Sequence, residues 1–232
     1  MASELLTYTL EGNVAVVRMD DGKANALSDA MIDAILEALA RAENEAGAMI
    51  LAGREGRFSG GFDLKVMMSS PAAAKALLTH GVDLFMKLYA SKVPLVIACT
   101  GHALAGGALM VLCGDLRVGA EGAFRIGLNE VEIGLPVPVL AMELARDRLA
   151  KSELTKATLL ATVYDPGGAV RAGYLDEIVP ADAVLAKAKE EATKLTRLSK
   201  TAFEASKVRL RKKTIDHIYA SLEADMASLL PS

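Results

Sequence analysis

The stretch "GHALAGGALMVLCGD", Gly101 to Asp115, decides the fold, because it joins an apolar run to a cluster of glycines. Its leucines predict a buried helix, and Gly106 and Gly107 fall in the first turn of that helix. A glycine inside a helix costs about 1 kcal/mol relative to alanine. We therefore expect another chemical group to approach the backbone at this turn.

Strands and helices alternate on both sides of this stretch. β-branched and apolar runs predict strands, and leucine and isoleucine at helical spacing predict helices between them. Such alternation is typical of an α/β protein with a parallel sheet that is covered on both faces. After Pro138 the pattern is mostly helical, and the last forty or so residues read as a helical appendage. The predicted strands include "NVAVVRM" (13–19), "AMILAG" (48–53), "VPLVIACT" (93–100), "LRVGA" (116–120) and "AFRI" (123–126), and the predicted helices include one over about 71–91.

A second glycine turn, "FSGGFDL" (Phe58 to Leu64), lies about one strand–helix–strand unit before Gly106. In a parallel sheet both turns can open at the edge where ligands usually bind. Two backbone N–H groups that converge there form an oxyanion hole, and glycine lets a carbonyl oxygen approach closely. The alternative is that both turns serve only tight packing. Neither turn has the spacing of a dinucleotide fingerprint, a P-loop or a serine nucleophile elbow.

The segments "FSGGFDLKVM", "VPLVIACTGHALAGGALMVLCGD" and "FRIGLNEVEIGL" together resemble the crotonase superfamily of enoyl-CoA hydratases and isomerases, as do "GKANALSDAM" and "AVRAGYLDEIVP". The resemblance implies an α/β fold, the crotonase spiral of repeated ββα units, with acyl-CoA bound in a core over residues 1–184. It also implies a C-terminal helical region, residues 185–232, that builds a homotrimer or a dimer of trimers. The backbone N–H groups of Gly60 and Gly106 are the implied oxyanion donors. The implied thioester and CoA site is Gly60, Gly61, Phe62, Asp63 and Leu64.

The resemblance also selects an acid–base residue. Glu130 falls at the position of the catalytic glutamate, and Asn129 resembles a substrate-contacting asparagine of the isomerase branch. Leu109 stands where hydratases usually place a further glutamate. One carboxylate suffices to move a proton from C2 to C4, so isomerisation of 3-enoyl-CoA to 2-enoyl-CoA is favoured over hydration. Glu132 is a substitute base if it shares a strand face with Glu130.

Other activities stay open at this point. They are a 2-enoyl-CoA hydratase, another acyl-CoA hydrolase or dehalogenase, and a non-catalytic relative that binds RNA. A net charge of −3 and the absence of tryptophan disfavour nucleic acid as a partner. Cys99 and Cys113 have no metal-type spacing, so no metal site is predicted. No permanently bound cofactor is expected, since coenzyme A belongs to the substrate.

The N-terminus carries no secretory pattern and no run is long enough to cross a bilayer, so we expect a cytoplasmic protein with no membrane contact. Lys23 and Ala24 precede Asn25 in a loop that is a candidate for CoA contact. The basic run Lys207, Arg209, Arg211, Lys212 and Lys213 is interpreted as a solvated helix face, with contact to CoA phosphates as the alternative.

Overall fold

A computed structural model describes residues 5–229 and contains two sheets. The larger sheet has the strand order β1-β2-β3-β5-β7-β9. Its first pair is antiparallel, and every other neighbouring pair is parallel. The strands are β1 (Leu6–Glu11), β2 (Val14–Met19), β3 (Ala48–Ala52), β5 (Leu95–Cys99), β7 (Leu116–Ala120) and β9 (Glu177–Val179).

The smaller sheet is parallel, with the order β4-β6-β8. Its strands are β4 (Gly56–Ser59), β6 (Gly101–Leu104) and β8 (Ile126–Gly127). Each strand of this sheet directly follows a strand of the larger sheet, and a helical segment follows each pair. The chain therefore repeats a ββα unit, one strand to each sheet, and this confirms the predicted spiral.

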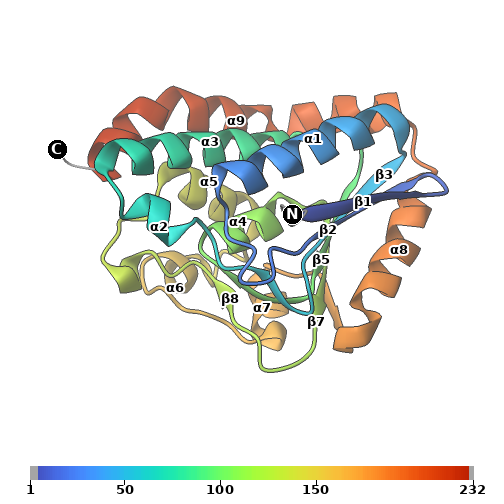
Figure 1. Ribbon diagram of the computed structural model, residues 1–232, viewed down its shortest axis with the longest axis horizontal. Coiled ribbons are helices and arrows are strands. Elements are labelled where there is room, and N and C mark those ends of the chain that lie inside the picture. Colours follow the sequence, from blue (N-terminus) through green and yellow to red (C-terminus); the bar gives the residue numbers. More distant parts are fainter. Residues whose placement is uncertain (1–4, 230–232) are drawn as a thin grey trace.

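Helices cover both faces of the larger sheet (Figure 1). Helices α1 (Asp29–Glu45), α3 (Pro71–Tyr89) and α9 (Lys200–Leu229) lie together across the top of the figure, and α8 (Val184–Leu195) lies on the other side of the sheet. Helix α1 begins after Ser28, whose side chain accepts a hydrogen bond from the Met31 N–H, and its buried face is apolar. The remaining helices are α2 (Leu64–Met67), α4 (Gly106–Cys113), α5 (Val139–Arg148), α6 (Leu154–Thr158) and α7 (Pro166–Ala172), with 3-10 turns η1 (Val131–Ile133) and η2 (Ala181–Ala183).

The C-terminal helices pack on the rest of the chain. Val184, Ala188 and Ala192 of α8 join the apolar cluster on one face of the larger sheet. Helix α9 packs against α3 and α5. The segment assigned to oligomerisation thus completes the core of its own chain, and its role in a trimer stays a prediction.

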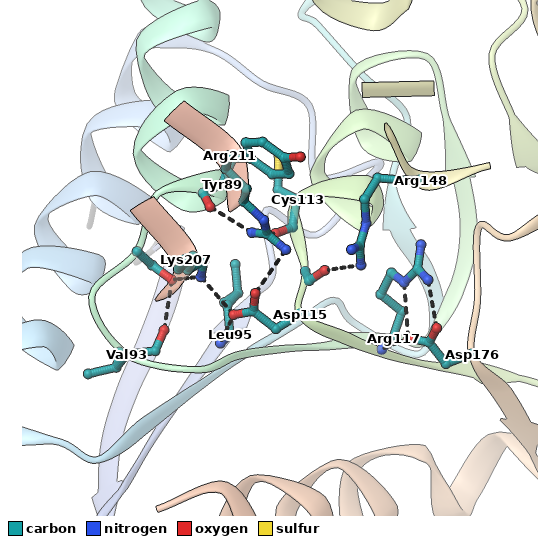
Figure 2. A network of polar contacts seen from close by, with 12 residues as sticks. Tyr89, Val93, Leu95, Cys113, Asp115, Arg117, Arg148, Asp176, Lys207 and Arg211 are labelled. Atoms are coloured by element: carbon teal, nitrogen blue, oxygen red, sulfur yellow. Dashed lines mark hydrogen bonds and ion pairs between the residues drawn. The ribbon is translucent and has the colours of Figure 1, made fainter. Parts of the chain in front are cut away.

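The basic run on α9 is only partly a solvated face. Lys207 and Arg211 are buried, and both reach the carboxylate of Asp115, which follows α4 (Figure 2). The Lys207 Nζ lies 2.7 Å and the Arg211 Nη2 lies 2.9 Å from its oxygens. The interpretation as a solvated face is therefore wrong for these two residues, because their spacing of four directs both side chains to the core. Arg209, Lys212 and Lys213 are exposed.

Candidate functional site

The three segments selected from the sequence meet at one edge of the smaller sheet. Ser59 of β4 is in register with Ala103 of β6, and Leu104 of β6 is in register with Gly127 of β8. Because neighbouring parallel strands end at the same edge, the turns after the three strands lie side by side. Phe62 follows β4, Gly106 follows β6, and Glu130 follows β8. The prediction that both glycine turns open at one end is confirmed.

The two glycine turns touch. A Cβ added at Gly61, which has φ +91°, would lie 3.1 Å from the Gly106 nitrogen and 3.1 Å from the Leu104 carbonyl oxygen. A Cβ at Gly107 would lie only 2.2 Å from the Ser59 carbonyl oxygen. Gly107 is therefore a packing glycine that lets α4 sit against β4. The two glycines of this turn therefore have different roles. Gly107 is required for packing, and only Gly106 is left for contact with a ligand.

The backbone N–H of Gly60 is not free. It donates to the Ala24 carbonyl oxygen at 2.9 Å, so the expectation that Gly60 supplies an oxyanion donor is wrong. The next turn residues show why. The Gly61 carbonyl accepts from Leu27 N–H and the Asp63 N–H donates to the Leu27 carbonyl, so the Phe62 N–H between them faces the opposite side.

Two amides at this edge remain available. Gly106 is the first residue of α4, where a backbone N–H has no partner within its own helix. Over residues 5–229, neither the Gly106 N–H nor the Phe62 N–H donates to a protein acceptor. Phe62 and Gly106 are therefore two free amides at this edge, and Phe62 lies two residues after Gly60, the donor that was expected.

Asn25 holds the first turn in place and was missed as a functional residue. It is fully buried, has φ +50°, and its amide nitrogen donates to the carbonyl oxygens of Met19 at 3.2 Å and Phe58 at 3.0 Å. Its own carbonyl oxygen accepts from the Ser59 hydroxyl at 2.8 Å. The sequence signal was an asparagine in a loop three residues after Gly22, since asparagine tolerates the left-handed conformation.

Ala105, just before α4, carries backbone strain. Its φ of +47° and ψ of −120° lie where residues with a side chain are rare. Such a conformation costs on the order of 1–3 kcal/mol and persists where the surrounding structure enforces it. Here the Ala105 N–H donates to the Gly127 carbonyl oxygen at 3.1 Å, and the strained residue turns the next amide, that of Gly106, out of the sheet.

Glu130 is a buried carboxylate at the end of β8. It is 8% exposed, and burial raises the pKa of its side chain, opposed by the backbone N–H groups of Glu130 and Asn129. Among the described residues its Oε2 has no hydrogen-bond partner, and the same is true of the Asn129 Oδ1. Leu109 on α4 is buried and apolar. This is the environment of a carboxylate that can accept a proton.

The other sequence candidates lie further out. Glu132 is exposed in the 3-10 turn, so the idea that it shares a strand face with Glu130 is wrong. Glu132 borders a cavity of about 370 Å³ with Leu159 and Leu160. Lys23 and Leu64 are exposed at the surface.

Ala24 and Asp63 have structural roles. The Ala24 carbonyl accepts the Gly60 N–H, and the Asp63 carboxylate accepts the Lys65 N–H at 2.9 Å and caps α2. In the part of the chain that the structure describes, no cluster of three acidic, histidine or cysteine side chains is suited to a metal ion. No helix in that part has the length and apolar character to cross a bilayer.

Comparisons with known proteins identify the family of this chain. A family model described as enoyl-CoA hydratase/isomerase matches residues 9–230. The mouse protein enoyl-CoA delta isomerase 1, mitochondrial, is 32% identical over 218 residues, which cover 92% of this chain and 75% of the mouse protein.

Two crystal structures are similar over nearly their full length. An enoyl-CoA hydratase/isomerase family protein from Pseudomonas syringae has a TM-score of 0.95 and 39% identity, covering 97% of this chain and 98% of that one. An enoyl-CoA hydratase from Mycobacterium marinum has a TM-score of 0.91 and 39% identity, covering 97% and 100%. The fold and site define an enzyme of the crotonase superfamily. The chain belongs to the enoyl-CoA hydratase/isomerase family.

Proposed function

We propose that this enzyme isomerises 3-enoyl-CoA thioesters to 2-enoyl-CoA thioesters, with Glu130 as the only acid–base group. The observation that carries the proposal is the buried carboxylate of Glu130, whose Oε2 has no partner among the described residues, at the sheet edge where the two free amides also lie. Leu109 on α4 is buried as well. A leucine can neither accept a proton nor orient a water molecule. This favours moving a proton within the substrate over adding water.

The two amides stabilise the intermediate in this proposal. The thioester carbonyl oxygen accepts hydrogen bonds from the N–H groups of Phe62 and Gly106. The Glu130 carboxylate takes the proton from C2, and the electron pair of the C2–H bond delocalises over a dienolate whose negative oxygen faces the amides. Removal of one such donor typically costs about 3 kcal/mol of barrier, or roughly a hundredfold in rate.

The same carboxylic acid then completes the reaction. Protonated Glu130 returns the proton to C4, the double bond moves from C3–C4 to C2–C3, and the carboxylate is regenerated. No water, metal ion or redox partner is consumed. In this proposal coenzyme A enters and leaves as part of the substrate, and the absence of a permanently bound cofactor stays a prediction.

The test measures ultraviolet absorbance as the conjugated 2-enoyl thioester appears from a 3-enoyl-CoA. We expect Glu130→Gln to abolish the signal, and Glu132→Gln to retain it as the matched control. Glu130→Gln should be at least as stable as the parent at neutral pH, because it removes a desolvated charge. Absence of conjugated product, together with rapid hydration of a 2-enoyl-CoA, would show a hydratase instead.

Assembly and location remain predictions. Sedimentation of the purified protein tests the homotrimer or dimer of trimers. A cytoplasmic location also remains a prediction, and the mouse relative is by name mitochondrial.

A further inference from the structure

Gly81 lies inside helix α3, where a glycine needs an explanation. The residue is buried, and glycine is less favourable than alanine in the interior of a helix. An alanine would not fit at this position. A Cβ added at Gly81 would lie 2.3 Å from the Cζ atom and 2.4 Å from the Cε1 atom of the Phe62 ring. The Phe62 ring therefore lies directly against the backbone of α3.

The same ring is confined on its other sides. It meets the ring of Phe85, also on α3, edge to face, with 6.0 Å between the ring centroids. A Cβ added at Gly106, the first residue of α4, would lie 3.5 Å from the Cδ2 atom of Phe62. The ring is partly buried and packs on the main apolar core. It thus lies between α3 and the residue that carries the second free amide.

The backbone of Phe62 is held separately. The Leu27 N–H donates to the Gly61 carbonyl oxygen at 2.8 Å, and the Asp63 N–H donates to the Leu27 carbonyl oxygen at 3.1 Å. These two bonds set the direction of the Phe62 N–H between them. They do not join Phe62 to α4, whereas the ring contacts do.

We propose that Gly81 is a positioning residue for the Phe62 amide, because its missing side chain admits the ring that spaces this amide from that of Gly106. The inference rests on the proposed function, in which the two amides hold the thioester oxygen. A Cβ at position 81 would push the ring. Since Phe85 and Gly106 confine the ring, the displacement would pass to the Phe62 backbone. A misplacement of about 1 Å in a site can cost on the order of a hundredfold in rate.

The first test measures turnover of a 3-enoyl-CoA by Gly81→Ala. We expect kcat to fall between about tenfold and a hundredfold, and KM to stay within about twofold, because an oxyanion hydrogen bond strengthens as negative charge develops. Phe62→Leu removes the ring atoms that the new Cβ would meet. In the Phe62→Leu background, Gly81→Ala should therefore change kcat by less than about twofold.

Gly119→Ala is the matched control. Its Cβ would lie 2.3 Å from the Cδ1 atom of Leu175, on β7 of the larger sheet, whereas the two amides follow strands of the smaller sheet. This variant should lose stability in urea unfolding and keep the parent kcat per folded molecule. The same result for Gly81→Ala would show a role in packing alone and overturn the inference. An equal loss of kcat in the parent and Phe62→Leu backgrounds would overturn it too.

A second measurement needs no turnover. In protein labelled with ¹⁵N-phenylalanine, the Phe62 amide signal is followed as a 2-enoyl-CoA is added to saturation, and Phe62→Leu assigns the signal. We expect a shift in the parent that Gly81→Ala reduces by at least half and Gly119→Ala leaves unchanged. An equal shift in Gly81→Ala, or no shift in the parent, overturns the inference. The expected shifts without conversion of a 3-enoyl-CoA would support the positioning role and refute the isomerase activity alone.

Discussion

Replacement of Asp115 by asparagine should destabilise the protein strongly through helix α9. The Asp115 carboxylate accepts from the Leu95 N–H at 2.8 Å and pairs with Lys207 and Arg211, whose side chains are 5% and 3% exposed. An amide keeps the shape of the acceptor and removes the charge. Two buried cations then lose the carboxylate that they share (Figure 2).

The two cations contribute unequally to the loss. Burial lowers the pKa of Lys207 to about 8, although Asp115 opposes the shift, so at pH 7 its neutral amine lies only about 1.4 kcal/mol above the charged form. Lys207 can therefore release its proton when Asp115 is neutralised. Arg211 stays charged at this pH, and most of the penalty falls on it. Breaking a buried pair from one side typically costs about 3–5 kcal/mol.

The assay is urea unfolding at neutral pH, with hydrogen exchange to follow the amides of α9. Asp216→Asn is the control, because Asp216 pairs with Lys212 at the surface, where both side chains are more than half exposed. That variant should lose less than about 1 kcal/mol. If Asp115→Asn loses no more than this control, or if α9 exchanges at the parent rate, the cluster does not hold α9 and the reasoning is refuted.

Three further changes test other parts of the structure. Gly107→Ala should lower activity more than tenfold and lower the free energy of unfolding by about 1–3 kcal/mol, because the added Cβ would lie 2.2 Å from the Ser59 carbonyl oxygen. Gly167→Ala is the control, since the closest neighbour of its Cβ would be 3.6 Å away. In assays of turnover and urea unfolding this control should behave like the parent protein. Asn25→Ala should cost about 3 kcal/mol, measured by urea unfolding, because two carbonyl oxygens lose their donor. The depressed pKa of Lys207, about 8 against an ordinary 10.5, means that the unfolded chain binds more protons between these values. The contribution of Lys207 to the free energy of unfolding should therefore rise between pH 8 and 10.5, by up to about 1.4 kcal/mol per pH unit. Urea unfolding measured at several pH values should show this rise in the parent protein and not in Lys207→Met.

The sequence predicted which turns meet but not which amide is free. Glycine pairs mark a tight approach, and the resemblance located both turns at one sheet edge. The direction of each N–H depends on the bridge between Leu27 and Phe62, a contact between segments far apart in the chain. The resemblance implied Gly60 as a donor by its position, whereas the Gly60 N–H donates to the carbonyl oxygen of Ala24 in a neighbouring loop. No local pattern contains that information.

Burial of charge was also hidden from the sequence. Lys207 and Arg211 belong to a run of five basic residues, and composition alone assigns such a run to solvent. Their separation of four residues, with Asp115 at the end of another helix, was the usable signal. Glu132 shows the opposite error. Two acidic residues at strand spacing suggested a shared face, but the chain leaves β8 after Gly127 and turns into a 3-10 helix, which sends Glu132 to the surface.

The strand order β4-β6-β8 determines which turns are neighbours at this edge of the smaller sheet. Neighbouring strands are about 4.8 Å apart, so amides that follow β4 and β6 are close enough to share one oxygen. In a bound thioester, C2 lies one bond beyond the carbonyl carbon, away from the carbonyl oxygen that the amides would hold. A base that reaches C2 must therefore come from an element other than the two that carry the amides. Glu130 comes from the next strand, and β8 ends early enough to leave the carboxylate buried at the edge. If the base followed β4 or β6 instead, it would compete with the amides for the same space. The topology thus places the two free amides and Glu130 after three different strands, and this supports the proposal that charge stabilisation and proton transfer are separate and that one acid–base residue is enough.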